Sequence, residues 1–270
     1  SLALNTKGNK NVAIGESALY TFNSTSDTDT YNTAVGHHAG VSVTTGQYNT
    51  LVGGLSGDAI TTGGFNVAMG YTALGANQAG SQAVAIGAFA LNVQNVAGAT
   101  NNVAVGHSAG AAVTEGIRNT LLGANAGLAI TEGGENVVVG YEALKNEDGH
   151  GKNTAIGTQA LFTQNAGATA QNVAVGYQAG AAVTTGIYNT LVGSLAGDAL
   201  NDADNNVAIG RAALSSDTTG HGSVAIGRNA LVTQNITGGA TTGNVAVGDQ
   251  AGSAVTSGVD NTFVGAQCGD

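Results

Sequence analysis

A short motif that recurs about every 17 residues constrains the fold of this chain more than any other feature. Each copy typically begins with Asn, continues with three mainly aliphatic residues and a Gly, and places a small residue, mostly Ala, three positions after that Gly. Successive motif glycines are 17 residues apart in ten of fourteen steps, and the remaining steps are 19 or 21 residues long. The fifteen motif glycines are Gly15, Gly36, Gly53, Gly70, Gly87, Gly106, Gly123, Gly140, Gly157, Gly176, Gly193, Gly210, Gly227, Gly248 and Gly265.

The length of this repeat selects the fold class. Helical repeat proteins use about 33 or more residues per unit, so a 17-residue unit is too short for a helical hairpin. The Val, Ile and Thr residues of the motif favour a strand, and the Gly that follows favours a turn. We therefore predict an all-β parallel β-solenoid of about fifteen coils, in one continuous domain over residues 1–270. Because the chain begins and ends inside the pattern, we interpret it as a fragment of a longer fibrous protein.

A second period groups the coils into blocks of four. The residue after the motif alanine is Gly in two successive coils and Leu in the next two, as in Gly40, Gly57, Leu74 and Leu91. The longer steps follow the second Leu coil, so the block spans about 70 residues and contains one long loop. The long loops are residues 20–31, 92–101, 162–171 and 232–243.

An asparagine at the start of the motif predicts a ladder along the solenoid axis. Thirteen of the fifteen units begin with Asn, and the exceptions are Ala83 and Ser223. Stacked coils align equivalent side chains, and aligned amides can hydrogen-bond from coil to coil. The predicted ladder consists of Asn11, Asn32, Asn49, Asn66, Asn102, Asn119, Asn136, Asn153, Asn172, Asn189, Asn206, Asn244 and Asn261.

The predicted strands are apolar on both faces, which favours an oligomer. In the first motif, Val12 and Ile14 share one face and Ala13 points to the other. A thin coil has only one interior, so we expect the second face to be covered by identical subunits, in a homotrimer. The bulky residues at the central strand position recur every fourth coil, and we assign them to the oligomer face. These residues are Leu51, Leu121, Leu191 and Phe263.

Composition and charge exclude several classes of partner. The net charge of −10 argues against nucleic acid as a partner, and no apolar run is long enough to insert into a membrane. A single cysteine, Cys268, excludes an intrachain disulfide. There is no phosphate-binding or dinucleotide-binding glycine motif, and we expect no cofactor and no resident metal. His37 and His107 occupy equivalent coils about 19 Å apart, too far to share an ion.

One segment imitates a hydrolase motif. Residues Gly106 to Gly110 read Gly-His-Ser-Ala-Gly, the pattern of a nucleophile elbow. The equivalent segments of the other blocks, which begin at Gly36, Gly176 and Gly248, contain no serine, and no helical pattern follows the strand. We therefore predict that the chain is not an enzyme and has no catalytic residues.

Exposed turns and the long loops are the candidate receptor contacts. Three of the loops share a Gln-Asn pair, whose amides suit the hydroxyl groups of a glycan, and three tyrosines directly follow motif glycines, where their rings could stack on sugars. These candidates are Tyr71, Tyr141, Tyr177, Gln94, Asn95, Gln164, Asn165, Gln234 and Asn235. The partner expected there is a host-surface polysaccharide or a protein receptor.

The repeats resemble two families of attachment proteins. Residues 11–15 (NVAIG) are similar to the head repeats of trimeric autotransporter adhesins of the YadA type. Residues 172–180 (NVAVGYQAG) and 189–198 (NTLVGSLAGD) are more similar to repeats of bacteriophage tail fibres. The resemblance covers nearly the whole chain and implies a left-handed β-roll, a trimer, and location on a virion or at the cell surface. The coils of the adhesin heads are shorter, which favours the tail fibre over the adhesin head.

Two other functions remain as alternatives. Threonine pairs such as Thr44-Thr45 and Thr61-Thr62 are typical of β-solenoid ice-binding proteins, which align threonines in rows along the coils. In other coils Glu115 and Glu132 take the place of the second threonine and interrupt such a row. A polysaccharide depolymerase on a β-helix would need a cluster of carboxylates in a groove, whereas the acidic residues here are scattered.

Overall fold

The computed structural model describes residues 1–269, and this part of the chain is all-β, without an α-helix. The chain is a β-solenoid of about fifteen coils, as the repeat predicts. Its contacts divide it into two compact units, Ser1–Gly134 and Glu135–Asp270, and each unit is described by itself below.

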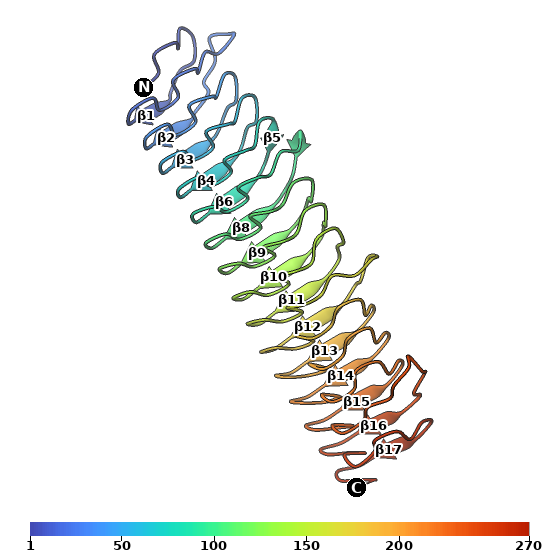
Figure 1. Cartoon of the computed structure of the whole chain (residues 1–270). Helices are drawn as coiled ribbons and strands as arrows, with labels where there is room; N and C mark the ends of the chain where they lie inside the picture. Colours follow the sequence, from blue (N-terminus) through green and yellow to red (C-terminus); the bar gives the residue numbers. More distant parts are fainter. Residues whose placement is uncertain (270) are drawn as a thin grey trace. The chain divides into compact units, whose positions relative to one another are not determined.

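The first unit contains seven coils, each with one strand of a parallel sheet (Figure 1). Equivalent motif residues lie side by side, so that Ala34 of one strand pairs with Leu51 of the next. A further two-stranded sheet, β5 (Gly80–Ser81) and β7 (Gly98–Ala99), forms at the base of a long loop. The strands of the main sheet are β1 (Val12–Ile14), β2 (Thr33–Val35), β3 (Thr50–Val52), β4 (Val67–Met69), β6 (Val84–Ile86), β8 (Val103–Val105) and β9 (Thr120–Leu122).

The second unit contains eight coils with the same parallel register (Figure 1). Its strands are β10 (Val137–Val139), β11 (Thr154–Ile156), β12 (Val173–Val175), β13 (Thr190–Val192), β14 (Val207–Ile209), β15 (Val224–Ile226), β16 (Val245–Val247) and β17 (Thr262–Val264). Strands of three residues are short, but each backbone segment hydrogen-bonds to the coils before and after it, so the ladder runs through the unit.

The motif glycine is required by the turn that ends each strand. Gly36 has φ of 143°, which L-residues rarely adopt, and a Cβ at this position would lie 2.4 Å from the carbonyl oxygen of Gly53. The turn then places the second and fourth residues after the glycine in the left-handed region, as at His38 and Gly40. A glycine therefore permits both the conformation and the close stacking of adjacent coils.

The central residue of each strand points into the coil interior. Leu51, Leu121 and Leu191 are fully buried within the chain, and Phe263 is half-buried in the last coil. These residues therefore fill the interior of the coil. The prediction that they form an oligomer face is wrong, because they lie on the inner face of the strands and not on the outer one. The period of two distinguishes the faces of a strand, but with both faces apolar it cannot indicate which face turns inward.

The predicted asparagine ladder forms, with the backbone as its main partner. The Oδ1 atom of Asn189 accepts the backbone N–H of Asn206 at 3.0 Å, and its Nδ2 atom donates to the carbonyl of Ala203 at 2.7 Å. Equivalent bonds join Asn32 to the backbone of Asn49 and of Gly46. Such an amide ties its own coil to the next one, where it pairs with one backbone N–H and one backbone carbonyl. The Nδ2 atoms of Asn11 and Asn153 are exceptions and have no hydrogen-bond partner among the described residues.

Candidate functional site

The outer face of the sheet is a surface of aliphatic side chains. In each three-residue strand the first and third side chains point away from the interior, and these positions carry mainly Val, Ile and Thr. The most exposed members range from 36% at Ile156 to 70% at Val264, and they are Val12, Ile14, Met69, Val137, Ile156, Ile209 and Val264. Nothing within the described chain covers this face, whereas the opposite face of the strands is packed.

The three tyrosines predicted as receptor contacts are exposed. Tyr71, Tyr141 and Tyr177 each leave about half of their surface in solvent. Tyr71 makes an edge contact with Phe89 at 5.6 Å, and Phe89 contacts the His107 ring in the same way at 5.8 Å. Tyr71, Phe89 and His107 come from three successive turns, and the edge contacts join their rings into a row along the surface.

The glutamines of the long loops are buried, which contradicts their predicted role in glycan binding. Gln94, Gln164 and Gln234 have no exposed surface. Each accepts a hydrogen bond from the ladder asparagine of the next coil, for example Gln164 Oε1 from Asn172 Nδ2 at 3.0 Å. Their amides therefore satisfy interior polar groups where the backbone departs into the long loop.

The asparagines that follow these glutamines do reach the surface. Asn95, Asn165 and Asn235 are exposed. The Oδ1 atom of Asn95 accepts the backbone N–H of Gln78 at 3.2 Å, and that of Asn235 accepts the Thr218 hydroxyl at 3.0 Å. Part of their hydrogen-bonding capacity is thus used within the chain.

Buried acidic residues partner two of the loop glutamines. Asn77, Glu147 and Asp217 occupy equivalent buried positions 70 residues apart. The Oε2 atom of Glu147 accepts hydrogen bonds from Gln164 Nε2 at 3.0 Å and from the backbone N–H of Ala166 at 3.5 Å. Burial raises the pKa of the Glu147 carboxyl above its usual range, although these hydrogen bonds oppose the shift. The residue types alone do not mark this position, but the 70-residue spacing of Asn77, Glu147 and Asp217 does.

An aromatic stack lies on the first coils. Tyr31, Tyr48 and Phe65 directly precede the ladder asparagines, and their rings stack with centroid distances of 5.7 and 4.7 Å. The ammonium group of Lys10 lies 5.2 Å from the Tyr31 ring centroid and is paired with Asp29 at 2.7 Å. Tyr48 lies between the other two rings, and Phe65 at the end of the stack remains 60% exposed.

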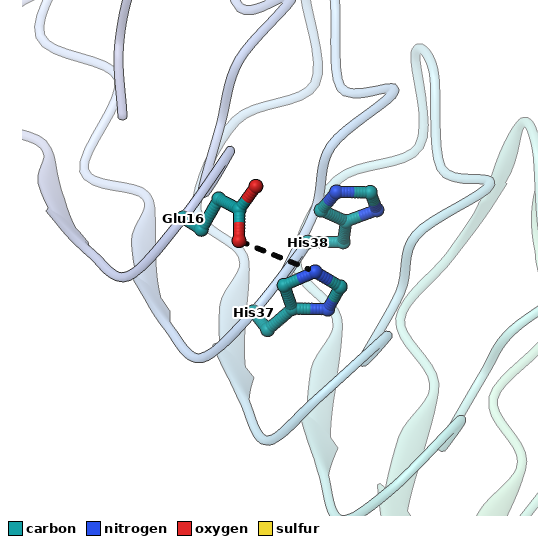
Figure 2. Close-up of side chains that lie close together, drawn as sticks. All are labelled: Glu16, His37 and His38. Atoms are coloured by element: carbon teal, nitrogen blue, oxygen red, sulfur yellow. Dashed lines mark ion pairs between the residues drawn. The ribbon is translucent and has the colours of Figure 1, made fainter.

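A carboxylate and two imidazoles come together at the first two coils (Figure 2). Glu16 and His37 each directly follow a motif glycine in adjacent coils, and Glu16 Oε2 lies 3.7 Å from His37 Nε2. The His38 ring stacks on that of His37, with centroids 4.0 Å apart and an interplanar angle of 11°. The sequence comparison of His37 with His107 overlooked this group, because the partner of His37 is the acid one coil earlier.

The segment that imitates a nucleophile elbow forms an ordinary turn of the solenoid. Ser108 lies in the left-handed position common to all coils, and its backbone N–H donates to the Ala88 carbonyl at 2.9 Å. The strand–elbow–helix setting that such a nucleophile requires is not formed there.

Residues 1–269 contain no helix with the length and apolar character needed to cross a bilayer. No family model matches the chain, and no curated protein or solved structure is significantly similar to it.

Proposed function

We propose that this chain is a structural and adhesive segment of an attachment fibre, in which three copies pack side by side through their outer sheet faces. The observation that carries the proposal is the row of exposed aliphatic side chains on that face, including Ile156 and Ile209. Contiguous apolar surface of this kind is typical of protein–protein contacts. Assembly through this face would bury the side of each strand that the coil interior leaves uncovered.

The bonding within the coils suits a stiff spacer. Backbone hydrogen bonds join successive coils, and a buried asparagine such as Asn172 or Asn189 adds side-chain bonds between them. Such bonds would all have to break for one coil to separate from its neighbour. A segment built in this way can hold a distal binding domain at a fixed distance from a particle or cell.

The resemblance of the repeats supports a bacteriophage tail fibre first and the head of a bacterial trimeric adhesin second. An ice-binding surface is less well supported by the contacts of the threonines. The hydroxyl groups of Thr44 and Thr61 donate to carbonyl groups of the next coil at 3.1 and 3.0 Å. These hydroxyls are used in hydrogen bonds between coils, and Glu115 and Glu132 interrupt the row of threonines.

Adhesion would use exposed side chains away from the sheet face. Tyr71, Tyr141 and Tyr177 present rings that can pack against a sugar or an apolar part of a protein receptor. Each contact would be weak, but three chains with repeated blocks would multiply the binding.

The assembly is tested by light scattering coupled to size exclusion. We expect a mass three times that of the 26.2 kDa chain. Replacing two outer residues, Ile156→Glu and Ile209→Glu, should give a folded monomer, because an aliphatic contact becomes a pair of buried charges. Thr185→Glu is the matched control, since Glu115 occupies the equivalent position of another block, and it should remain a trimer. A wild-type monomer would overturn the proposed assembly.

The adhesive role is tested by binding to an array of bacterial surface polysaccharides. We expect the Tyr141→Ala and Tyr177→Ala variants to bind more weakly than the wild type. Tyr188→Ala removes an equally exposed ring at a different position of the coil and should leave the binding unchanged. Equal loss in all three variants would contradict the assignment of the contacts.

A further inference from the structure

We propose that Glu16, His37 and His38 form a binding site for a divalent transition-metal ion of the zinc class. The proposal concerns the first two coils and is independent of the trimer. A carboxylate oxygen and two imidazole nitrogens are available there, and the three donor atoms lie within 4.8 Å of one another (Figure 2). Two imidazoles and a carboxylate form a donor set that suits zinc, cobalt and nickel better than calcium or magnesium.

The backbone explains why these side chains meet. Glu16 and His37 are the first residues after Gly15 and Gly36, and the parallel register brings equivalent positions of adjacent coils side by side. The backbone N–H of His38 donates to the carbonyl of Glu16 at 2.8 Å, which fixes the two turns against each other. The donors thus stand on two turns whose separation is set by the backbone ladder.

The same position elsewhere shows that side chains on adjacent turns reach each other. Arg228 and Asp249 are the equivalents of Glu16 and His37 in the last block, and they form a two-pronged ion pair at 2.7 and 2.8 Å. The geometry of the turn therefore permits direct contact, and the residue types decide what the contact does.

The donor atoms are accessible and have few competing partners. The side chains of Glu16 and His37 are 77% and 58% exposed, and His38 is half-buried. Among residues 1–269, the side chains of these three residues contact one another through the 3.7 Å Glu16–His37 approach and the ring stack, without another side-chain hydrogen bond. His38 also interacts electrostatically with the carboxylate of Asp58. Metal–ligand distances of about 2.0–2.2 Å require the donors to move closer, and exposed side chains can rotate to do so.

In the other cluster of potential ligands the buried carboxylate is already engaged, although His150 Nδ1 has no hydrogen-bond partner within the described chain. Glu147, Asp148 and His150 also lie close together, but both oxygens of Glu147 already accept hydrogen bonds. Glu147 is also fully buried, so an ion would have to displace an interior contact with Gln164. The site at Glu16 is the better candidate because its atoms face solvent.

The remaining blocks provide a control within the chain. In the second block Ala88 replaces the acid, and His107 is followed by Ser108 instead of a second histidine. A single imidazole without the carboxylate should bind the ion much more weakly. Substitution of His107 therefore measures the effect of removing an exposed histidine without removing the proposed site.

Titration calorimetry with zinc chloride, on the metal-free chain of 270 residues in a non-chelating buffer, tests the proposal. We expect one ion per chain, and at least tenfold weaker binding for each of Glu16→Gln, His37→Gln and His38→Gln. The His107→Gln variant should bind as the wild type does, and circular dichroism should show that all four variants are folded. Absence of binding, an unchanged affinity in Glu16→Gln, or an equal loss in His107→Gln would overturn the site.

Discussion

The Cδ1 atom of Leu191 occupies the space into which a β-carbon on Gly180 would project, only 2.6 Å from that position. Gly180 follows the motif alanine of one coil, and Leu191 is the central residue of β13 in the next. The same pairing recurs between Gly110 and Leu121 at 2.5 Å. Where the turn carries Leu instead of Gly, the central residue of the next strand is smaller, as with Leu214 and Ala225. The four-coil period therefore reflects a compensation of side-chain volume. A large residue at the centre of a strand goes with a glycine in the preceding turn, and a leucine in that turn goes with a small central residue, so that the interior stays filled.

This relationship predicts a strong coupling between the two positions. Leu191→Ala should cost about 2–5 kcal/mol of the free energy of unfolding because it leaves a cavity. Gly180→Ala should cost about 1–3 kcal/mol, because the new methyl group meets Leu191 and the residue has φ of 60°. In the double variant the closest contact of the methyl group is gone, while Leu161 and Val183 remain 3.0 and 3.3 Å from it. The cost of the double variant should therefore be at least about 1 kcal/mol below the sum of the two.

Denaturant unfolding followed by circular dichroism measures the three free energies. Gly167→Ala is the matched control, since a Cβ there meets open space and the residue has no left-handed conformation. It should change the stability by about 0.5 kcal/mol or less. Strict additivity of the two interior substitutions would contradict the proposed compensation of side-chain volume.

The asparagine ladder makes a second prediction. Asn189→Ala removes the acceptor of the Asn206 backbone N–H and the donor to the Ala203 carbonyl, both in the interior. Leaving two buried polar groups without partners should cost about 2–5 kcal/mol of unfolding free energy. The exposed Asn146 provides the control, and Asn146→Ala should have little effect on the same urea transition. Similar losses in both variants would show that the ladder does not contribute as its geometry indicates.

Local regularity explains which parts of the fold were predictable. The 17-residue period, the strand at Val173–Val175 and the ladder position of Asn172 all follow from a pattern that each coil repeats. The inward direction of Leu51 did not follow, because Ala, Val and Leu on both faces leave the two sides of a strand equivalent in the sequence. The turn after each strand does not mark the side either, since its left-handed position carries residues as different as His38, Leu55 and Thr72.

The candidate site was less predictable because it depends on contacts between coils. The amide of Gln164 can hydrogen-bond to a glycan hydroxyl as well as to Asn172. Only the fold shows that this amide lies in the interior and bonds to Asn172. The Glu16–His37 contact was missed although both residues directly follow motif glycines. Aligning all fifteen coils by these glycines, and reading adjacent rows, would have brought that pair together.

The aromatic stack is expected to contribute to stability. Tyr48 stacks on Tyr31 and on Phe65, so Tyr48→Ala removes two ring contacts, each of which contributes about 0.5–1.5 kcal/mol beyond buried area. Tyr188 occupies the equivalent position in another coil and is similarly exposed, and Tyr188→Ala is the control. Thermal unfolding should show a larger loss for Tyr48→Ala, and equal losses would mean that the stack adds nothing to stability.

The buried Glu147 predicts an unusual dependence of stability on pH. Because burial raises the pKa of this carboxyl in the folded chain, the native state binds its proton more tightly than the unfolded state does. The contribution of Glu147 to stability is therefore greatest below its unfolded pKa of about 4.3, and it falls as the pH rises towards the raised folded value. Glu147→Gln removes this titration while keeping an amide that can bond to Gln164.

Urea unfolding at pH 4, 5.5 and 7 tests this sign. The Glu147→Gln variant should gain stability relative to the wild type as the pH rises, because only the wild type must then bury a charge. Asp202→Asn replaces an exposed carboxylate in the same unit, and its difference from the wild type should stay nearly constant. If the Glu147→Gln variant instead lost stability relative to the wild type with rising pH, the hydrogen bonds from Gln164 and Ala166 would outweigh the cost of burial. The carboxylate would then be the form that the interior favours.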